Sequence, residues 1–132
     1  PYGRGGSPIQ NLIIEGFTDS PVCALKMTEK IDGGPIYSQK VVSLSGDLSQ
    51  IFERIGKSIN ELIKEIIRDS PTPVEQIGEV RNFKRRTGTD NLIPTDLTLE
   101  QMYDRIRMLD AEGYPLSYFE VGDNQIEFSF EY

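Results

Sequence analysis

Residues 30–36 read Lys-Ile-Asp-Gly-Gly-Pro-Ile and decide the fold of the first half of the chain. They place the carboxylate of Asp32 in a glycine turn that leads directly into an apolar segment. Apolar residues before and after the turn predict two short strands, a mostly buried one over residues 22–27 and a second over residues 35–42. Asp32 then has two interpretations. It satisfies its own backbone, as Asp-Gly turns commonly do, or it orients a histidine or accepts a proton.

A long amphipathic helix is predicted after these strands. Asp47 and Gln50 have the spacing of a capping box, and apolar residues recur at steps of three and four until about residue 68. We expect this face to pack against a sheet or another helix. Its apolar positions are Ile51, Ile55, Ile59, Leu62, Ile63 and Ile66.

A shorter helix is predicted near the start of the chain. Ser7 can cap it, Pro8 can occupy its first position, and Gly16 can end it. The N–H groups of Gly5, Gly6 and Ser7, with the charge of Arg4, could bind an anion there. A flexible entry loop is an equally good interpretation of these glycines.

The second half begins with a connecting segment. The sequence Ser70-Pro71-Thr72-Pro73 stops the long helix, because each proline removes a backbone donor and restricts the residue before it. Further on, Thr98 and Gln101 predict a second capped helix. The sequence Gly122-Asp123-Asn124 predicts the turn of a β-hairpin, whose second strand continues to Phe130.

Composition limits the function classes. The 132 residues carry a net charge of −7, one cysteine and no histidine. The negative charge disfavours binding to a phosphate backbone, and no run of about 18 apolar residues predicts a membrane span. Without histidine there is no usual zinc site, and any histidine partner of Asp32 must come from outside these residues. A single cysteine favours a reducing compartment, the cytoplasm.

Three further features have a functional and a structural interpretation. Cys23 lies in an apolar strand and is expected to be a small core residue, because a nucleophilic role would need a base. The basic run Lys84-Arg85-Arg86 can bind phosphate or RNA, or can be a solvated loop. The rings of Tyr114, Phe128 and Phe130 can stack on a base, or can pack within the hairpin.

Residues 1–11 and 31–36 together resemble the formyltransferase family that uses 10-formyltetrahydrofolate, which includes methionyl-tRNA formyltransferases and sugar-nucleotide N-formyltransferases. In that family an Arg-Gly-x-x-Pro-Ile segment precedes an Asp-x-Gly turn by about two dozen residues. The matching residues here are Arg4, Gly5, Pro8, Ile9, Asp32 and Gly34.

The resemblance implies an α/β fold. Residues 1–70 would be the C-terminal portion of a Rossmann-like catalytic domain, and residues 71–94 a linker. Residues 95–132 would be the truncated start of a small α+β C-terminal domain, with a helix and a β-hairpin. Such a protein can be an oligomer.

The resemblance also implies a reaction and a set of site residues. Family members move a formyl group from 10-formyltetrahydrofolate to an acceptor amine, on methionyl-tRNA or on a nucleotide-linked amino sugar, without a metal. Asp32 would be the catalytic aspartate, which positions a histidine and assists proton transfer. Arg4, Gly5 and Gly6 would bind substrate. The folate pterin would lie along the backbone of Met27, Thr28, Glu29, Lys30 and Ile31.

One family motif, Asn-x-His, has no match in this sequence. We therefore expect the 132 residues alone to be an inactive fragment of such an enzyme. The alternative is a non-catalytic binding or assembly domain on the same scaffold. From Ile77 onward there are six basic and eleven acidic residues, which favours an amino-sugar nucleotide over tRNA as the acceptor.

Overall fold

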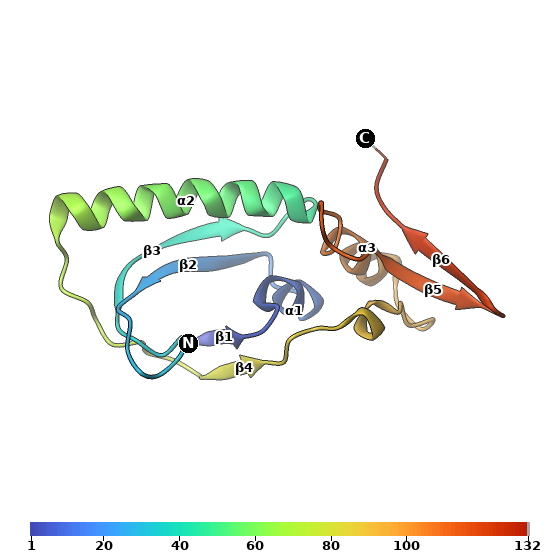
Figure 1. Cartoon of the computed structure of the whole chain (residues 1–132), viewed down its shortest axis with the longest axis horizontal. Coiled ribbons are helices and arrows are strands. Elements are labelled where there is room, and N and C mark those ends of the chain that lie inside the picture. The colour runs from blue at the N-terminus through green and yellow to red at the C-terminus, as the bar shows by residue number, and fades with distance from the viewer. Residues whose placement is uncertain (132) are drawn as a thin grey trace.

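The chain folds into a mixture of helices and strands, and this computed structural model describes residues 1–131 (Figure 1). The described strands form three two-stranded sheets. In chain order the elements are β1 (Tyr2–Gly5), α1 (Pro8–Ile14), β2 (Asp19–Leu25), β3 (Ile36–Ser43), α2 (Leu48–Asp69), β4 (Arg81–Phe83), the short 3-10 helix η1 (Gly88–Asn91), α3 (Leu99–Arg107), β5 (Ser117–Val121) and β6 (Asn124–Phe128).

The two predicted strands around Asp32 are confirmed as the antiparallel pair β2 and β3. The strand expected over residues 22–27 begins earlier, at Asp19, and ends at Leu25, so Met27 lies outside it with 94% of its surface exposed. Beyond Leu25 one more bond joins the two segments, from the N–H of Lys26 to the carbonyl of Pro35 at 2.8 Å, and it closes the loop that carries Asp32. β2 is also half-buried rather than mostly buried.

The long helix α2 is confirmed together with its cap and runs along the β2–β3 hairpin (Figure 1). The N–H of Gln50 donates to Asp47 Oδ1 at 2.9 Å, and the side chain of Gln50 accepts from the N–H of Asp47. The expected packing of the whole apolar face is wrong at Ile59 and Ile63, which are 44% and 50% exposed. Four residues turn an α-helix by about 40° more than a full circle, so a row at this spacing winds off the covered face.

The first helix, α1, begins as expected with Pro8 and is followed by Gly16 at a φ of 84°. The prediction that the Ser7 side chain caps it is wrong. Ser7 has a φ of 48° and makes no side-chain cap bond. Its hydroxyl instead accepts a hydrogen bond at 3.1 Å from the N–H of Arg86, which lies 79 residues away in the chain.

The connecting segment contains a strand that the sequence pattern did not predict. β4 pairs in parallel with β1, with Gly5 opposite Phe83. A Cβ on Gly5 would lie 2.4 Å from the carbonyl oxygen of Phe83, and Gly5 also has a φ of 94°. The N–H of Gly6 donates to the same carbonyl at 3.0 Å. Glycine at these two positions therefore lets the two backbones approach closely.

The main core cluster joins both halves of the chain. Its buried residues come from α1, from the segment after β3, from α2 and from the end of α3. They are Leu12, Ile13, Leu44, Ile51, Met108 and Leu109. Arg107 is also buried, and its guanidinium donates to the carbonyls of Leu44 and Gly46, so α3 is tied to the loop before α2.

The helix and hairpin predicted near the C-terminus are confirmed. The N–H of Gln101 donates to Thr98 Oγ1 at 3.2 Å in the cap of α3. β5 and β6 pair in antiparallel fashion around a two-residue turn that begins at Gly122, whose φ is 61°. β6 ends at Phe128, so Phe130 lies beyond the strand and packs against the ring of Tyr103. Tyr132, the last residue of the predicted C-terminal domain, lies outside the described residues.

Candidate functional site

The Asp32 turn is held by contacts with segments far from it in the sequence. Asp32 has a φ of 57°, in the left-handed region that few residues other than glycine adopt. Its Oδ2 accepts a hydrogen bond from the N–H of Gly5 at 3.1 Å, and its carbonyl accepts one from Gln76 Nε2 at 2.9 Å. The aspartate is therefore not a turn residue that only satisfies its own backbone. Its carboxylate and its carbonyl each have a remote partner.

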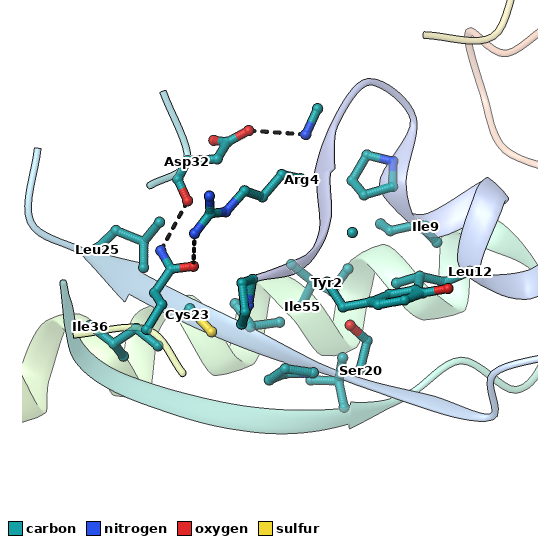
Figure 2. A pocket seen from close by; sticks show the side chains of 18 of the residues that line it. Tyr2, Arg4, Ile9, Leu12, Ser20, Cys23, Leu25, Asp32, Ile36 and Ile55 are labelled. Atoms are coloured by element: carbon teal, nitrogen blue, oxygen red, sulfur yellow. Dashed lines mark hydrogen bonds between the residues drawn. The ribbon is translucent and has the colours of Figure 1, made fainter. Parts of the chain in front are cut away.

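A cavity of about 340 Å³ lies next to this turn, which is within the usual size range of small-molecule sites. β1 and α1 line one side and the β2–β3 hairpin lines the other. Figure 2 shows Arg4 and Asp32 close together at one end of the cavity, and Tyr2 and Leu12 toward the other. The lining is mostly apolar, with a few polar groups gathered around Asp32.

A second hollow of about 280 Å³ lies within the loop that joins β2 to β3. Four of the five residues expected to lie along a pterin line it, namely Met27, Thr28, Lys30 and Ile31. Glu29 does not line it, although it belongs to the same exposed loop. Leu25 and Asp32 line both hollows, so Asp32 lies between the two spaces.

The three residues expected to bind substrate lie in different surroundings. Arg4 and Gly5 line the larger cavity, whereas Gly6 faces the segment after β4. One terminal nitrogen of Arg4, Nη2, donates to Gln76 Oε1 at 2.7 Å. Among the described residues, the buried Nε of Arg4 has no hydrogen-bond partner. The anion that Gly5 binds in this structure is the carboxylate of Asp32.

Cys23 differs from the expectation of a small core residue, because it is half-buried and lines the larger cavity. Its Sγ lies 3.6 Å from Gln39 Oε1. Burial raises the pKa of the Cys23 thiol, which keeps the neutral form and does not favour nucleophilic use.

The three residues of the basic run, Lys84 to Arg86, differ in their exposure to solvent. Lys84 and Arg85 are exposed, while Arg86 is half-buried and its guanidinium donates to the carbonyl of Asp90. Burial and the neighbouring charge of Arg105 lower the pKa of Arg86. Lys84 and Arg85 therefore face solvent, whereas Arg86 stabilises the segment after β4 through its hydrogen bond to Asp90.

The aromatic residues singled out as possible stacking surfaces pack against other rings of the chain. Tyr114 lies 5.7 Å from the ring of Phe52, and Phe128 lies 4.6 Å from the ring of Phe119, measured between centroids. These contacts correspond to the packing interpretation of the aromatic residues.

Two kinds of feature were not found in the part of the chain that the structure describes. No three His, Cys, Asp or Glu side chains of residues 1–131 gather in a way that could hold a metal ion. Within the same range, no helix combines the length and the apolar character needed to cross a membrane.

Gln76 is the site residue that the sequence pattern missed. It lines the larger cavity, and its amide joins Arg4 to the carbonyls of Asp32 and Gly34. A glutamine in a polar segment between two prolines and a short strand carries no periodic or motif signal. Only the three-dimensional arrangement reveals its position.

Formyltransferases are among the known proteins that this chain resembles in sequence and in structure. Residues 89–130 match the family model described as methionyl-tRNA formyltransferase, C-terminal domain. A methionyl-tRNA formyltransferase of Enterococcus faecalis is 30% identical over 114 residues, which cover 81% of this chain and 36% of the relative. The chain thus spans little more than a third of the length of this curated relative.

Solved structures extend the likeness to the whole fold. The methionyl-tRNA formyltransferase from Clostridium thermocellum is 42% identical with a TM-score of 0.93, over 98% of this chain and 58% of that one. A 4-N formyltransferase from Francisella tularensis is 24% identical with a TM-score of 0.75, over 99% of this chain and 58% of that one, and shows the fold alone. The family resemblance is confirmed, and the chain belongs to the formyltransferase family.

Proposed function

We propose that the protein carrying this chain transfers a formyl group from 10-formyltetrahydrofolate to the amine of methionyl-tRNA, with Asp32 as a catalytic carboxylate. The observation that carries this proposal is the place of Asp32, which lines both cavities. A donor in one cavity and an acceptor in the other would bring both reacting groups beside the same carboxylate. The likeness to methionyl-tRNA formyltransferases supports this choice of reaction.

The smaller hollow is the proposed place of the folate. Its loop carries exposed backbone groups from residues 27–31, and the exposed side chains of Met27 and Ile31 offer apolar surface for a ring system. β1 pairs in parallel with β4, as neighbouring strands do in a Rossmann-like domain, although β4 lies at residues 81–83, within the segment expected to be a linker.

The larger cavity is the proposed place of the acceptor. Arg4 lies at its end near Asp32, and its buried Nε has no partner among residues 1–131, so it can donate to an oxygen of the substrate. A buried donor left without a partner costs free energy, and a bound acceptor oxygen would relieve that cost.

The reaction needs one bond to form and one to break. The acceptor amine attacks the formyl carbon, and the resulting tetrahedral intermediate loses its bond to folate N10. The amine gives up one proton and N10 takes up one. The Asp32 carboxyl group, directed by the N–H of Gly5, can accept the proton or orient the group that does. The family resemblance implies that the Asn-x-His motif stabilises the negative charge on the formyl oxygen.

Formylation of methionyl-tRNA by the full-length protein and its Asp32→Asn variant tests the proposal. The substitution keeps the size of the side chain and removes its charge, so we expect kcat/KM to fall by roughly 10²–10⁴-fold, the usual contribution of a general acid or base. The matched control is Asp123→Asn in the exposed turn between β5 and β6, which should leave the rate unchanged. Full activity of Asp32→Asn would end the catalytic role of this residue.

The acceptor can be tested in the same assay. The excess of acidic over basic residues after Ile77 favours an amino-sugar nucleotide, whereas the structural likeness favours methionyl-tRNA. We expect turnover with methionyl-tRNA. Turnover with the amino-sugar nucleotide alone would identify the other acceptor class. Tight folate binding without turnover on either acceptor would instead support a non-catalytic binding or assembly domain.

A further inference from the structure

The side chain of Gln76 lies where three separate segments of the chain meet. Its Oε1 accepts from Arg4 Nη2 at 2.7 Å. Its Nε2 donates to the carbonyl of Asp32 at 2.9 Å and to that of Gly34 at 2.7 Å. One half-buried amide therefore connects β1, the turn between β2 and β3, and the segment that follows α2.

The backbone on the N-terminal side of Gln76 is itself anchored. Val74 and Ile36 form an isolated antiparallel bridge, with hydrogen bonds of 2.7 and 2.9 Å in the two directions. Ile36 is the first residue of β3, so the bridge fixes the chain two residues before Gln76 against the strand that leaves the turn. The amide is thereby presented to the turn by structured backbone.

The Asp32 turn needs the support of these hydrogen bonds. Asp32 adopts a left-handed φ that is unfavourable for a residue with a side chain, and within the turn the N–H of Gly33 donates to the carbonyl of Lys30 at 3.2 Å. The Gln76 amide adds two hydrogen bonds on the carbonyls that flank Gly33. These bonds determine where the Asp32 backbone lies, and so where its carboxylate meets the N–H of Gly5.

The orientation of the amide is also determined. Its oxygen faces a guanidinium and its nitrogen faces two carbonyl oxygens, so a flipped amide would oppose donor to donor and acceptor to acceptor. For the same reason a carboxylate at position 76 would keep the contact with Arg4 but place an oxygen against the two carbonyls.

We propose that Gln76 is a positioning residue, which holds the Asp32 turn against β1 and so directs the carboxylate into the site. This inference rests on the proposed function for its effect on catalysis, but its structural part is independent of that function. Gln76 touches no reacting atom and acts through Asp32.

Amide hydrogen exchange at Gly5 tests the structural part without any activity. The N–H of Gly5 donates to the Asp32 carboxylate, so its exchange should accelerate severalfold in Gln76→Ala and in Gln76→Glu. The control is Gln125→Ala on β6, an exposed glutamine outside both cavities, which should leave Gly5 exchange unchanged. Unchanged Gly5 exchange in a folded Gln76→Ala protein would overturn the proposal, whether or not the protein is a formyltransferase.

Turnover in a double-mutant cycle tests the catalytic part. In the full-length protein, Gln76→Ala should lower kcat by about 10²-fold, as misplacement of a reacting group by about 1 Å does, and should leave the KM for the folate donor nearly unchanged. In the Asp32→Asn background the same substitution should have no further effect on kcat, because Gln76 acts on the chemical step through that carboxylate, and loss of its bond to Arg4 should appear in the KM for the acceptor. A full second loss in that background would show that Gln76 acts independently of Asp32. Activity unaffected by Asp32→Asn would contradict the proposed function instead, and would leave the Gly5 exchange result standing.

Discussion

The Asp32 turn and the core beneath α2 are held in place by different forces. Asp32 is exposed, and its turn is held by hydrogen bonds from Gly5 and Gln76, each with a net value of about 1 kcal/mol. In the core, by contrast, Ile13 and Ile51 have no exposed surface. Burial of such side chains is worth several times more, but it is not directional. Changes in the core should therefore alter stability, and changes in the turn should alter geometry.

The largest expected effect on stability belongs to the core. Ile51→Ala removes three buried carbons from the contact between α2, α1 and the end of α3, and we expect the free energy of unfolding to fall by about 3 kcal/mol. Urea unfolding measures this change in the free energy of unfolding. Ile67→Ala on the same helix is the control, since Ile67 is 75% exposed and its loss should be within about 0.5 kcal/mol. Equal losses at the two positions would mean that solvent does not reach Ile67.

A second test concerns the polar link between the core and α3. Arg107 has a side chain that is 8% exposed, and it donates to the carbonyls of Leu44 and Gly46 and to Asp104 Oδ1, the last at 2.7 Å. Arg107→Met keeps the apolar stem and leaves these acceptors without their donor. We expect a loss of about 2 kcal/mol in the free energy of unfolding.

The control for this link is Arg85→Met, which removes the same group from an exposed position and should change stability little. If Arg107→Met were neutral, water must replace the guanidinium at these carbonyls. The link between α3 and the loop before α2 would then be apolar only.

The elements that the sequence predicted well have signals within a few residues of one another. The capping boxes at Asp47 and at Thr98 each need a partner three positions later, and both are confirmed. The pairing of β1 with β4 joins Gly5 to Phe83, and no local pattern reports a contact across such a distance. Helical periodicity likewise showed which residues share a face of α2, but not how much of that face is covered.

The candidate site likewise contains residues with a local sequence signal and residues whose role depends on remote contacts. Asp32 was found because an Asp-x-Gly turn between apolar segments is a local pattern, and its role in catalysis stays a proposal. Gln76 escaped notice because its three partners lie in β1 and in the turn, more than 40 residues away. Ser7 was assigned a cap that its sequence neighbours allow, but its hydroxyl is engaged by Arg86. Polar side chains that reach remote backbone are the hardest features to predict.

A smaller effect on stability is expected within the turn, where geometry should be more sensitive. A Cβ on Gly34 would lie 1.9 Å from the carbonyl oxygen of Lys26, so Gly34→Ala must push the loop away from the end of β2. Gly34 is buried, but the exposed residues before it can shift, so we expect a loss of about 1 kcal/mol in unfolding free energy, at the low end for overpacking. Gly5 amide exchange should nevertheless accelerate, because the Asp32 carboxylate moves with the turn.

Gly56→Ala is the matched control for this substitution. Gly56 lies in α2, and an added Cβ there meets nothing within 4 Å, so alanine should stabilise the protein by about 0.5–1 kcal/mol through helix propensity. Gly5 exchange should not change in this variant. A Gly34→Ala protein with unchanged Gly5 exchange would show that the turn holds Asp32 without depending on its close approach to Lys26.

The smallest effect should come from the ion pair that ties α2 to β3, and it should depend on pH. Lys40 and the hydroxyl of Ser38 both bind Glu65, and they lower the pKa of this carboxyl below its ordinary value. A depressed pKa stabilises the folded state above the ordinary glutamate pKa of about 4.3, and this contribution is lost as the pH falls through the lower folded value. Glu65→Gln should therefore lower the urea midpoint slightly at pH 7, and the difference from the unsubstituted protein should disappear in acid. Added salt should reduce the difference at pH 7, since the partners are partly exposed. If the difference in urea midpoint persisted unchanged in acid, Glu65 would contribute through packing. It would then resemble the core residues and not the polar contacts that hold the turn.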